Sequence, residues 1–168
     1  TATKAAFDAA LSGVGSSAKV YYAGKAFLSA EVVRWVAEAG LGVDVASHGE
    51  LAVALAAGLD PARIGVHGNN KSPAQLDAAV AAGVGAIVID AEVEIGRVAE
   101  AATRHGRVQP VRLRINSGVH ASTHEYLATA HEDQKFGVTL ADAPRLVAAI
   151  RSEPSLAFLG LHSHIGSQ

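Results

Sequence analysis

The sequence contains no cysteine and no methionine among its 168 residues. Without cysteine, the chain can form neither a disulfide nor a thiolate site. Its 14 lysines and arginines nearly balance 16 acidic residues, for a net charge of −2, and no basic run occurs. Nucleic acid and anionic membranes are therefore poor candidate partners. The sequence also lacks an apolar run long enough to span a bilayer and a signal-peptide pattern, so we expect a cytoplasmic protein with no membrane span.

The two ends of the chain are unusual for a complete protein. The sequence starts at Thr1 rather than at a methionine, and it stops at Gln168, directly after an apolar segment with a functional pattern. Its length suits one domain with one core. We therefore expect residues 1–168 to be a segment of a longer protein.

Short apolar segments recur along the chain at even intervals. The first four start at residues 20, 42, 64 and 86, which are 22 residues apart. This period fits a repeated unit of one strand and one crossover helix. The predicted strands are Val20–Ala23, Gly42–Ala46, Ile64–His67, Ala86–Asp90, Val111–Asn116 and Phe158–Ile165.

The segments between these strands carry helix signals. Ser29 and Ser72 have the character of N-caps, and Ser47 with Glu50 has the spacing of a capping box. The pairs Ala39-Gly40, Ala57-Gly58 and Ala82-Gly83 predict three helix ends. The predicted helices span residues 3–12, 30–37, 50–57, 73–82, 91–105 and 139–151.

Six consecutive units predict an α/β protein with parallel strands. A doubly wound open sheet is the competitor, but the near-equal repeat favours a (β/α)8 TIM-type barrel of which this chain holds about six of eight units. The polar segment 117–135 follows the fifth strand and has no clear period. Because α/β sites form at the carboxyl ends of strands, we expect this segment to border a site.

Polar side chains at the ends of the first three strands are candidate site residues. Lys25 follows the first strand, which we interpret as buried; a desolvated amine loses its proton more easily and can form a Schiff base with an aldehyde cofactor. The simpler alternative is a lysine whose ammonium reaches solvent. Asp44 lies inside an apolar strand and needs a lysine or histidine partner. His67 is a possible site-lining residue, within a segment of turn-forming residues.

Later strands supply further candidates. Asp90 could line the site or cap the next helix. Arg112 and Arg114 alternate with apolar residues and so share one face of a strand, where an arginine needs an anion. His162 and His164 also share a face, which is a metal-ligand spacing and suggests a metal-dependent hydrolase as a rival. Gly166 and Ser167, which follow, instead favour phosphate binding, because glycine lets the backbone approach closely.

Several segments together resemble the fold-type III pyridoxal phosphate decarboxylases, and most of all their diaminopimelate decarboxylase branch. One such segment is weak evidence, but several in the right order are strong. The likeness covers essentially the whole chain. The matching segments are Tyr22–Phe27, Asp44–Glu50, Arg112–Asn116, His124–Tyr126, Lys135–Gly137 and His162–Gln168.

The resemblance implies a barrel of the alanine racemase and decarboxylase kind, with pyridoxal 5'-phosphate as cofactor. It implies that Lys25 carries the cofactor as a Schiff base and that His164 stacks on its ring. Gly166 and Ser167 would bind its phosphate. Asp44 and Glu50 would lie near the lysine and the histidine, and Arg114 near the polar edge of the cofactor. The resemblance thus implies the site residues Lys25, Asp44, Glu50, Arg114, His164, Gly166 and Ser167, and His67 is added from its position alone.

The expected reaction is decarboxylation of meso-2,6-diaminopimelate to L-lysine by a homodimeric full-length enzyme. The family's remaining barrel strands, its C-terminal β-domain and most of its substrate-reading residues lie beyond this segment. A decarboxylase or racemase for another amino acid therefore stays open as an alternative. The isolated segment is expected to be inactive, since an unclosed barrel exposes two sheet edges.

Overall fold

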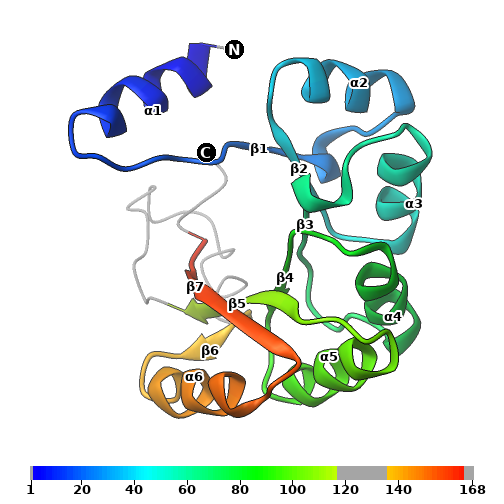
Figure 1. Ribbon diagram of the computed structural model, residues 1–168, viewed down its shortest axis with the longest axis vertical. Coiled ribbons are helices and arrows are strands. Elements are labelled where there is room, and N and C mark those ends of the chain that lie inside the picture. The colour runs from blue at the N-terminus through cyan, green and yellow to red at the C-terminus, as the bar shows by residue number, and fades with distance from the viewer. Residues whose placement is uncertain (1, 117–135, 165–168) are drawn as a thin grey trace, which may run out of the picture.

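The computed structural model describes residues 2–116 and 136–164 (Figure 1). Strands and helices alternate along the chain, as the even sequence period predicts. Two short 3-10 turns, η1 and η2, precede α2 and β3. The elements are α1 (Ala2–Ser12), β1 (Tyr21–Ala23), η1 (Gly24–Ala26), α2 (Ala30–Glu38), β2 (Gly42–Val45), α3 (His48–Ala56), η2 (Pro61–Arg63), β3 (Ile64–Val66), α4 (Pro73–Ala82), β4 (Ala86–Ile89), α5 (Val93–Arg104), β5 (Gln109–Asn116), β6 (Val138–Thr139), α6 (Ala143–Ser152) and β7 (Leu156–His162).

All the strand pairs are parallel. The main path runs β1-β2-β3-β4-β5, and β7 continues it by pairing with β5, while β6 pairs with the last two residues of β5. Figure 1 shows helices α2 to α5 following one another along one flank of these strands. The six predicted strands and the parallel α/β class are confirmed, except that the predicted end of the last strand, Ile165, lies outside the described residues. The sheet is an incomplete barrel in which β1, β6 and β7 each pair with one described neighbour.

Local signals account for the helix boundaries. The hydroxyls of Ser29, Ser47 and Ser72 each accept a backbone N–H at the starts of α2, α3 and α4. The glycines of the three Ala-Gly pairs lie just past the ends of these helices, and all have positive φ, between 73° and 83°. A left-handed backbone is strained for other residues, so glycine is the natural stop there.

Apolar side chains from the strands and from the inner helix faces form one continuous core. Val43, Ile64, Ile87 and Leu113 come from four successive strands and are fully buried. Full burial of a side chain of this size stabilises the fold by about 1.5–3 kcal/mol. In the described residues, no helix combines the length and apolar character needed to cross a membrane.

The start of the last helix was predicted wrongly. Val138 and Thr139 form the short strand β6, and α6 begins only at Ala143. The Thr139 hydroxyl accepts the Asp142 N–H at 3.1 Å and donates to its carboxylate, which forms a turn before the helix. The pairing of β6 with β5 joins segments more than twenty residues apart, and no local pattern could have predicted it.

Candidate active site

Parallel strands bring their carboxyl ends to the same edge of the sheet, and the candidate polar residues lie at that edge. The pairing register aligns Asp44 with Gly65 across β2 and β3, and Arg114 with His162 across β5 and β7. Aligned residues point to the same face. The residues that this edge gathers are Lys25 after β1, Asp44 in β2, His67 after β3, Asp90 after β4, Arg114 in β5 and His162 at the end of β7.

Asp44 and His67 form the closest pair among these candidates. His67 Nε2 lies 3.0 Å from Asp44 Oδ1, and both side chains are partly exposed, at 25% and 32%. The contact follows from the register, because His67 is two residues beyond Gly65 and therefore faces the same way as Asp44. The prediction that Asp44 needs a lysine or histidine partner is confirmed, and the partner is His67.

His67 also contacts His162, although the strands that carry them, β3 and β7, are separated in the sheet by β4 and β5. The two rings meet edge to face, with centroids 5.0 Å apart and planes at 72°. Burial, reinforced by the neighbouring His67 and Arg114, lowers the pKa of His162 from 6.5 to about 4. Nδ1 of His162 is buried and has no hydrogen-bond partner among the described residues. His162 is therefore a neutral imidazole at pH 7, with a ring nitrogen left for a ligand.

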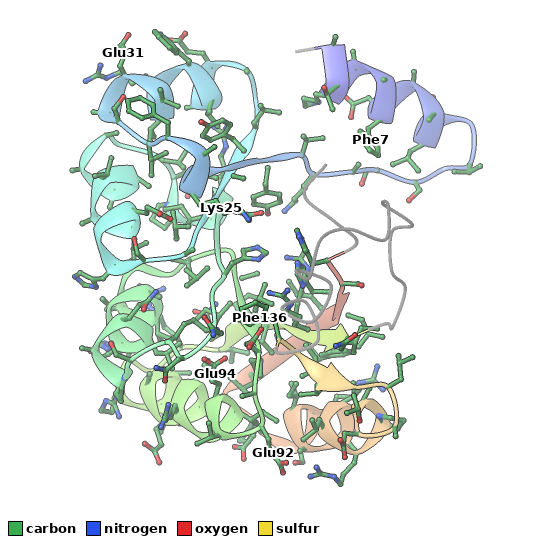
Figure 2. The ribbon with its side chains drawn as sticks, turned by 180° about the vertical axis from the view of Figure 1, so that it is seen from behind. Phe7, Lys25, Glu31, Glu92, Glu94 and Phe136 are labelled. Atoms are coloured by element: carbon green, nitrogen blue, oxygen red, sulfur yellow. The ribbon has the colours of Figure 1, made fainter. Side chains whose placement is uncertain are left out.

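Arg114 finds an anion in Asp90, as its position predicts. Their side chains are 17% and 8% exposed, and Nη1 of Arg114 lies 3.7 Å from Oδ1 of Asp90. Burial raises the pKa of Asp90, and the Arg114 charge opposes that shift. The Arg114 guanidinium also lies over the ring of Phe136, 5.2 Å from its centroid, and Figure 2 shows Phe136 in this region. The alternative role of Asp90 as a helix cap is wrong, because its carboxylate faces Arg114 and Glu92 precedes α5.

Lys25 corrects one prediction. It follows the first strand as expected, in the turn η1, but no residue of β1 is fully buried and the Lys25 side chain is exposed (Figure 2). The reason is that β1 is an edge strand of the described sheet and pairs only with β2. Gly24 before it is buried, and a Cβ there would come 2.8 Å from the Asp44 carbonyl oxygen, so the turn is pressed against β2. Tyr22 fixes the other side of the turn by donating to the Phe27 carbonyl at 2.8 Å.

Glu50 belongs to the start of α3. Its N–H donates to the Ser47 hydroxyl at 3.2 Å, and its carboxylate accepts the Ala46 N–H at 2.6 Å. The predicted capping interaction is thus confirmed, with the carboxylate reaching one residue further back than in the usual capping box.

Two functional candidates escaped the sequence reasoning. Lys71 and Glu94 form a fully buried ion pair below the site, at 1% exposure each. Lys71 ends the segment interpreted as a plain turn, and Glu94 falls on a helix with ordinary charge spacing. A buried lysine in a polar turn leaves no signal in a single sequence.

Some predicted residues lie outside the described ranges. His164 is the last described residue, whereas Gly166, Ser167 and the polar segment 117–135 fall beyond the described parts. Within the ranges 2–116 and 136–164, no group of three or more His, Asp or Glu side chains could hold a metal ion. No described residue cluster therefore supports the rival hydrolase interpretation.

Comparison with known proteins identifies close relatives. Residues 2–168 match the family described as "pyridoxal-dependent decarboxylase, pyridoxal binding domain". The chain is 54% identical to the diaminopimelate decarboxylase of Mycobacterium tuberculosis strain H37Rv over 156 aligned residues. The alignment covers 92% of this chain and 35% of that protein. The chain thus spans about a third of the length of this curated relative.

Solved structures agree with this match. The diaminopimelate decarboxylase of M. jannaschii superimposes with a TM-score of 0.86 at 30% identity, over 98% of this chain and 38% of that one. The Helicobacter pylori enzyme complexed with L-lysine gives a TM-score of 0.80 at 29% identity, over 89% of this chain and 38% of that one. The incomplete barrel described above is therefore a part of a fold already seen in these enzymes.

Proposed function

Because this chain belongs to the pyridoxal-dependent decarboxylases, we propose that it forms the cofactor-binding part of an enzyme that decarboxylates meso-2,6-diaminopimelate to L-lysine. The observation that carries the proposal is the meeting of Asp44, His67 and His162 at one edge of the sheet. Arg114 is aligned with His162 in the neighbouring strand, and Lys25 follows β1 at the same edge. The relatives' names support the choice of substrate.

The described residues fit pyridoxal 5'-phosphate. A lysine amine, a neutral imidazole, a carboxylate and a guanidinium are the groups that bind an aldehyde, a ring and polar ring substituents. Lys25 is exposed, so its amine is accessible for attachment of the cofactor. The unpartnered Nδ1 of His162 is a buried polar atom that a ligand would satisfy. When bound, the cofactor supplies an electron sink for the carbon that loses carbon dioxide.

The chain's own residues orient the cofactor and control protons. Lys25 would hold it through Nζ, and His164 would stack on its ring, as the family motif implies. Arg114 would bind its polar edge and Asp44 would lie near Lys25, while His67 keeps the Asp44 carboxylate in place from 3.0 Å away. The His162 imidazole stays neutral at pH 7 because its pKa is lowered to about 4, and so it adds no positive charge beside Arg114.

Other features of the proposal depend on residues outside the described ranges. Gly166 and Ser167 would bind the cofactor phosphate, as the family motif implies. We propose that residues 1–168 are part of a barrel completed by further strands and a C-terminal β-domain in a longer, cytoplasmic, homodimeric protein. The share of the relative's length that the chain covers, 35%, supports this. The substrate is a small amino acid rather than a nucleic acid.

The cofactor is tested by borohydride trapping in the full-length protein, the longest natural chain that contains this sequence. We expect pyridoxal phosphate to label one peptide, the one with Lys25, and the label to disappear in Lys25→Ala. Lys19→Ala is the matched control, because Lys19 is also exposed and lies six residues upstream. Label on several lysines, or on none, would contradict the proposal.

The substrate is tested by release of carbon dioxide from single amino acids. We expect release from meso-diaminopimelate with formation of lysine, and none from lysine, ornithine or arginine. Release of carbon dioxide from lysine, ornithine or arginine would contradict the proposed substrate and assign the protein to another branch of the family, whereas the proposed cofactor site would stand.

A further inference from the structure

The least solvent-accessible charged side chains among the described residues are Lys71 and Glu94. Each is 1% exposed, and Nζ of Lys71 lies 2.8 Å from Oε2 of Glu94. Lys71 ends the loop after β3, and Glu94 lies in the first turn of α5, after β4. Figure 2 shows Glu94 near the start of α5. Neither residue has a part in the proposed chemistry.

The Glu94 carboxylate connects two loops through both its oxygens. Oε1 accepts the backbone N–H of Lys71 at 3.2 Å, and Oε2 accepts the backbone N–H of Asp90 at 2.9 Å. The Lys71 ammonium in turn donates to the Gly68 carbonyl at 2.6 Å. One ion pair therefore fixes both ends of the loop from Gly68 to Lys71 and the backbone at Asp90.

These loops carry two of the residues that form the site. His67, next to Gly68, contacts both Asp44 and His162. Asp90 faces Arg114 from 3.7 Å. Gly68 passes so close to β2 that a Cβ there would come 3.0 Å from the Ala46 carbonyl oxygen, which leaves little room for the loop to shift. A displacement of the ion pair would thus be transmitted to both sides of the site.

Stability alone is a weak reason for such a pair. The desolvation penalty of a buried ion pair often exceeds its attraction, so well-packed apolar replacements are frequently neutral or stabilising. Apolar side chains could fill the same volume, but they could not accept hydrogen bonds from the backbone N–H groups of Lys71 and Asp90. The feature that only the charged pair supplies is the fixed position of the two loops.

We propose that Lys71 and Glu94 are positioning residues, which hold the His67 loop and Asp90 in place and thereby set the affinity of the site for pyridoxal phosphate. This proposal rests on the proposed function. Both residues act through His67 and Asp90 rather than by contact with the cofactor.

The first readout needs no cofactor. In the cofactor-free full-length protein, the imidazole NMR signals of His67 and His162 are compared between wild type and Glu94→Gln. We expect both signals to shift, because the Asp90 N–H and the Lys71 ammonium lose a carboxylate acceptor. Glu92→Gln is the matched control: it makes the same change two residues earlier, in an exposed ion pair with Arg145, and should leave both signals in place.

The second readout is cofactor binding, followed by the visible absorbance of the bound pyridoxal phosphate. We expect Glu94→Gln to raise its Kd roughly tenfold, the effect of one lost hydrogen bond to a charged group. The pH at which the absorbance changes should shift as well. Glu92→Gln should change neither.

A double variant separates positioning from stability. Lys71→Met with Glu94→Leu should unfold at a higher temperature than Glu94→Leu alone, because no buried charge is left without a partner, yet keep the raised Kd. Recovery of wild-type Kd in this variant would overturn the proposal, and so would unshifted His67 and His162 signals in Glu94→Gln. If wild type itself captures no pyridoxal phosphate at Lys25, the proposed function fails, and the histidine signals still decide whether the pair positions these loops.

Discussion

The carboxylate of Asp44 lies directly over the α-carbon of Gly65, in the space that a side chain at position 65 would occupy. The glycine is therefore a requirement of the site rather than of the strand, since its backbone is ordinary extended chain. Absence of a Cβ at 65 lets Asp44 reach across β3 toward His67.

Gly65→Ala should separate Asp44 from His67. The added methyl displaces the carboxylate, at a cost of about 1–3 kcal/mol in the free energy of unfolding. Denaturant unfolding and the His67 imidazole signal would measure the two effects. Gly96→Ala is the control: its Cβ would meet nothing within 4 Å, and in a helix the change should stabilise by about 0.5–1 kcal/mol. An unchanged His67 signal in Gly65→Ala would contradict the prediction.

The low pKa of His162 makes stability depend on pH in a defined window. The unfolded imidazole binds its proton near pH 6.5 and the folded one near pH 4. The stability that depends on a neutral His162 is therefore fully present above pH 6.5, and it is lost as the pH falls toward 4, because the unfolded chain binds the proton more tightly. The shift corresponds to about 3 kcal/mol at most, and about 1–2 kcal/mol after discounting for partial exposure.

His162→Gln should remove this part of the pH dependence. Unfolding of wild type and variant at pH 7, 5.5 and 4 measures the difference, and an NMR titration of His162 gives its pKa directly. Titration of His162 at its ordinary value would show that the ring is not desolvated.

Arg114→Met should reduce the free energy of unfolding, and the reduction relative to wild type should be larger at pH 7 than at pH 4. The pKa of Asp90 is already raised by burial, so its ionisation opposes folding as the pH rises, and Arg114 reduces that penalty. We expect a loss of about 2 kcal/mol at pH 7, less than for a closely paired buried charge. Arg145→Met, in an exposed pair, should have no measurable effect. Parallel pH curves for wild type and Arg114→Met would contradict this interpretation.

Glu50→Gln should destabilise α3 without changing cofactor capture. Its carboxylate accepts the Ala46 N–H, and loss of that interaction should cost about 1 kcal/mol. Ser47→Ala, which removes the other half of the capping interaction, should cost a similar amount. If Glu50→Gln abolishes borohydride labelling of Lys25 and Ser47→Ala does not, Glu50 belongs to the site instead.

The sequence by itself determined the alternation of strands and helices. The 22-residue period, the serine N-caps and the glycine stops depend on neighbours a few residues away, and for that reason they were predictable. The sharing of a face by Arg112 and Arg114 follows equally from the two-residue period of a strand, and the need of Asp44 for a cationic or imidazole partner follows from the cost of burying a charge.

The tertiary structure alone decided which partner each polar residue found. His67 contacts Asp44 because two strands pair in one register, and Lys25 is exposed because β1 lies at an edge of the described sheet. The Lys71 ammonium can be buried because the carboxylate of Glu94, 23 residues further along the chain, pairs with it. Each depends on segments distant in sequence that meet only after folding, and a local pattern carries no information about that meeting.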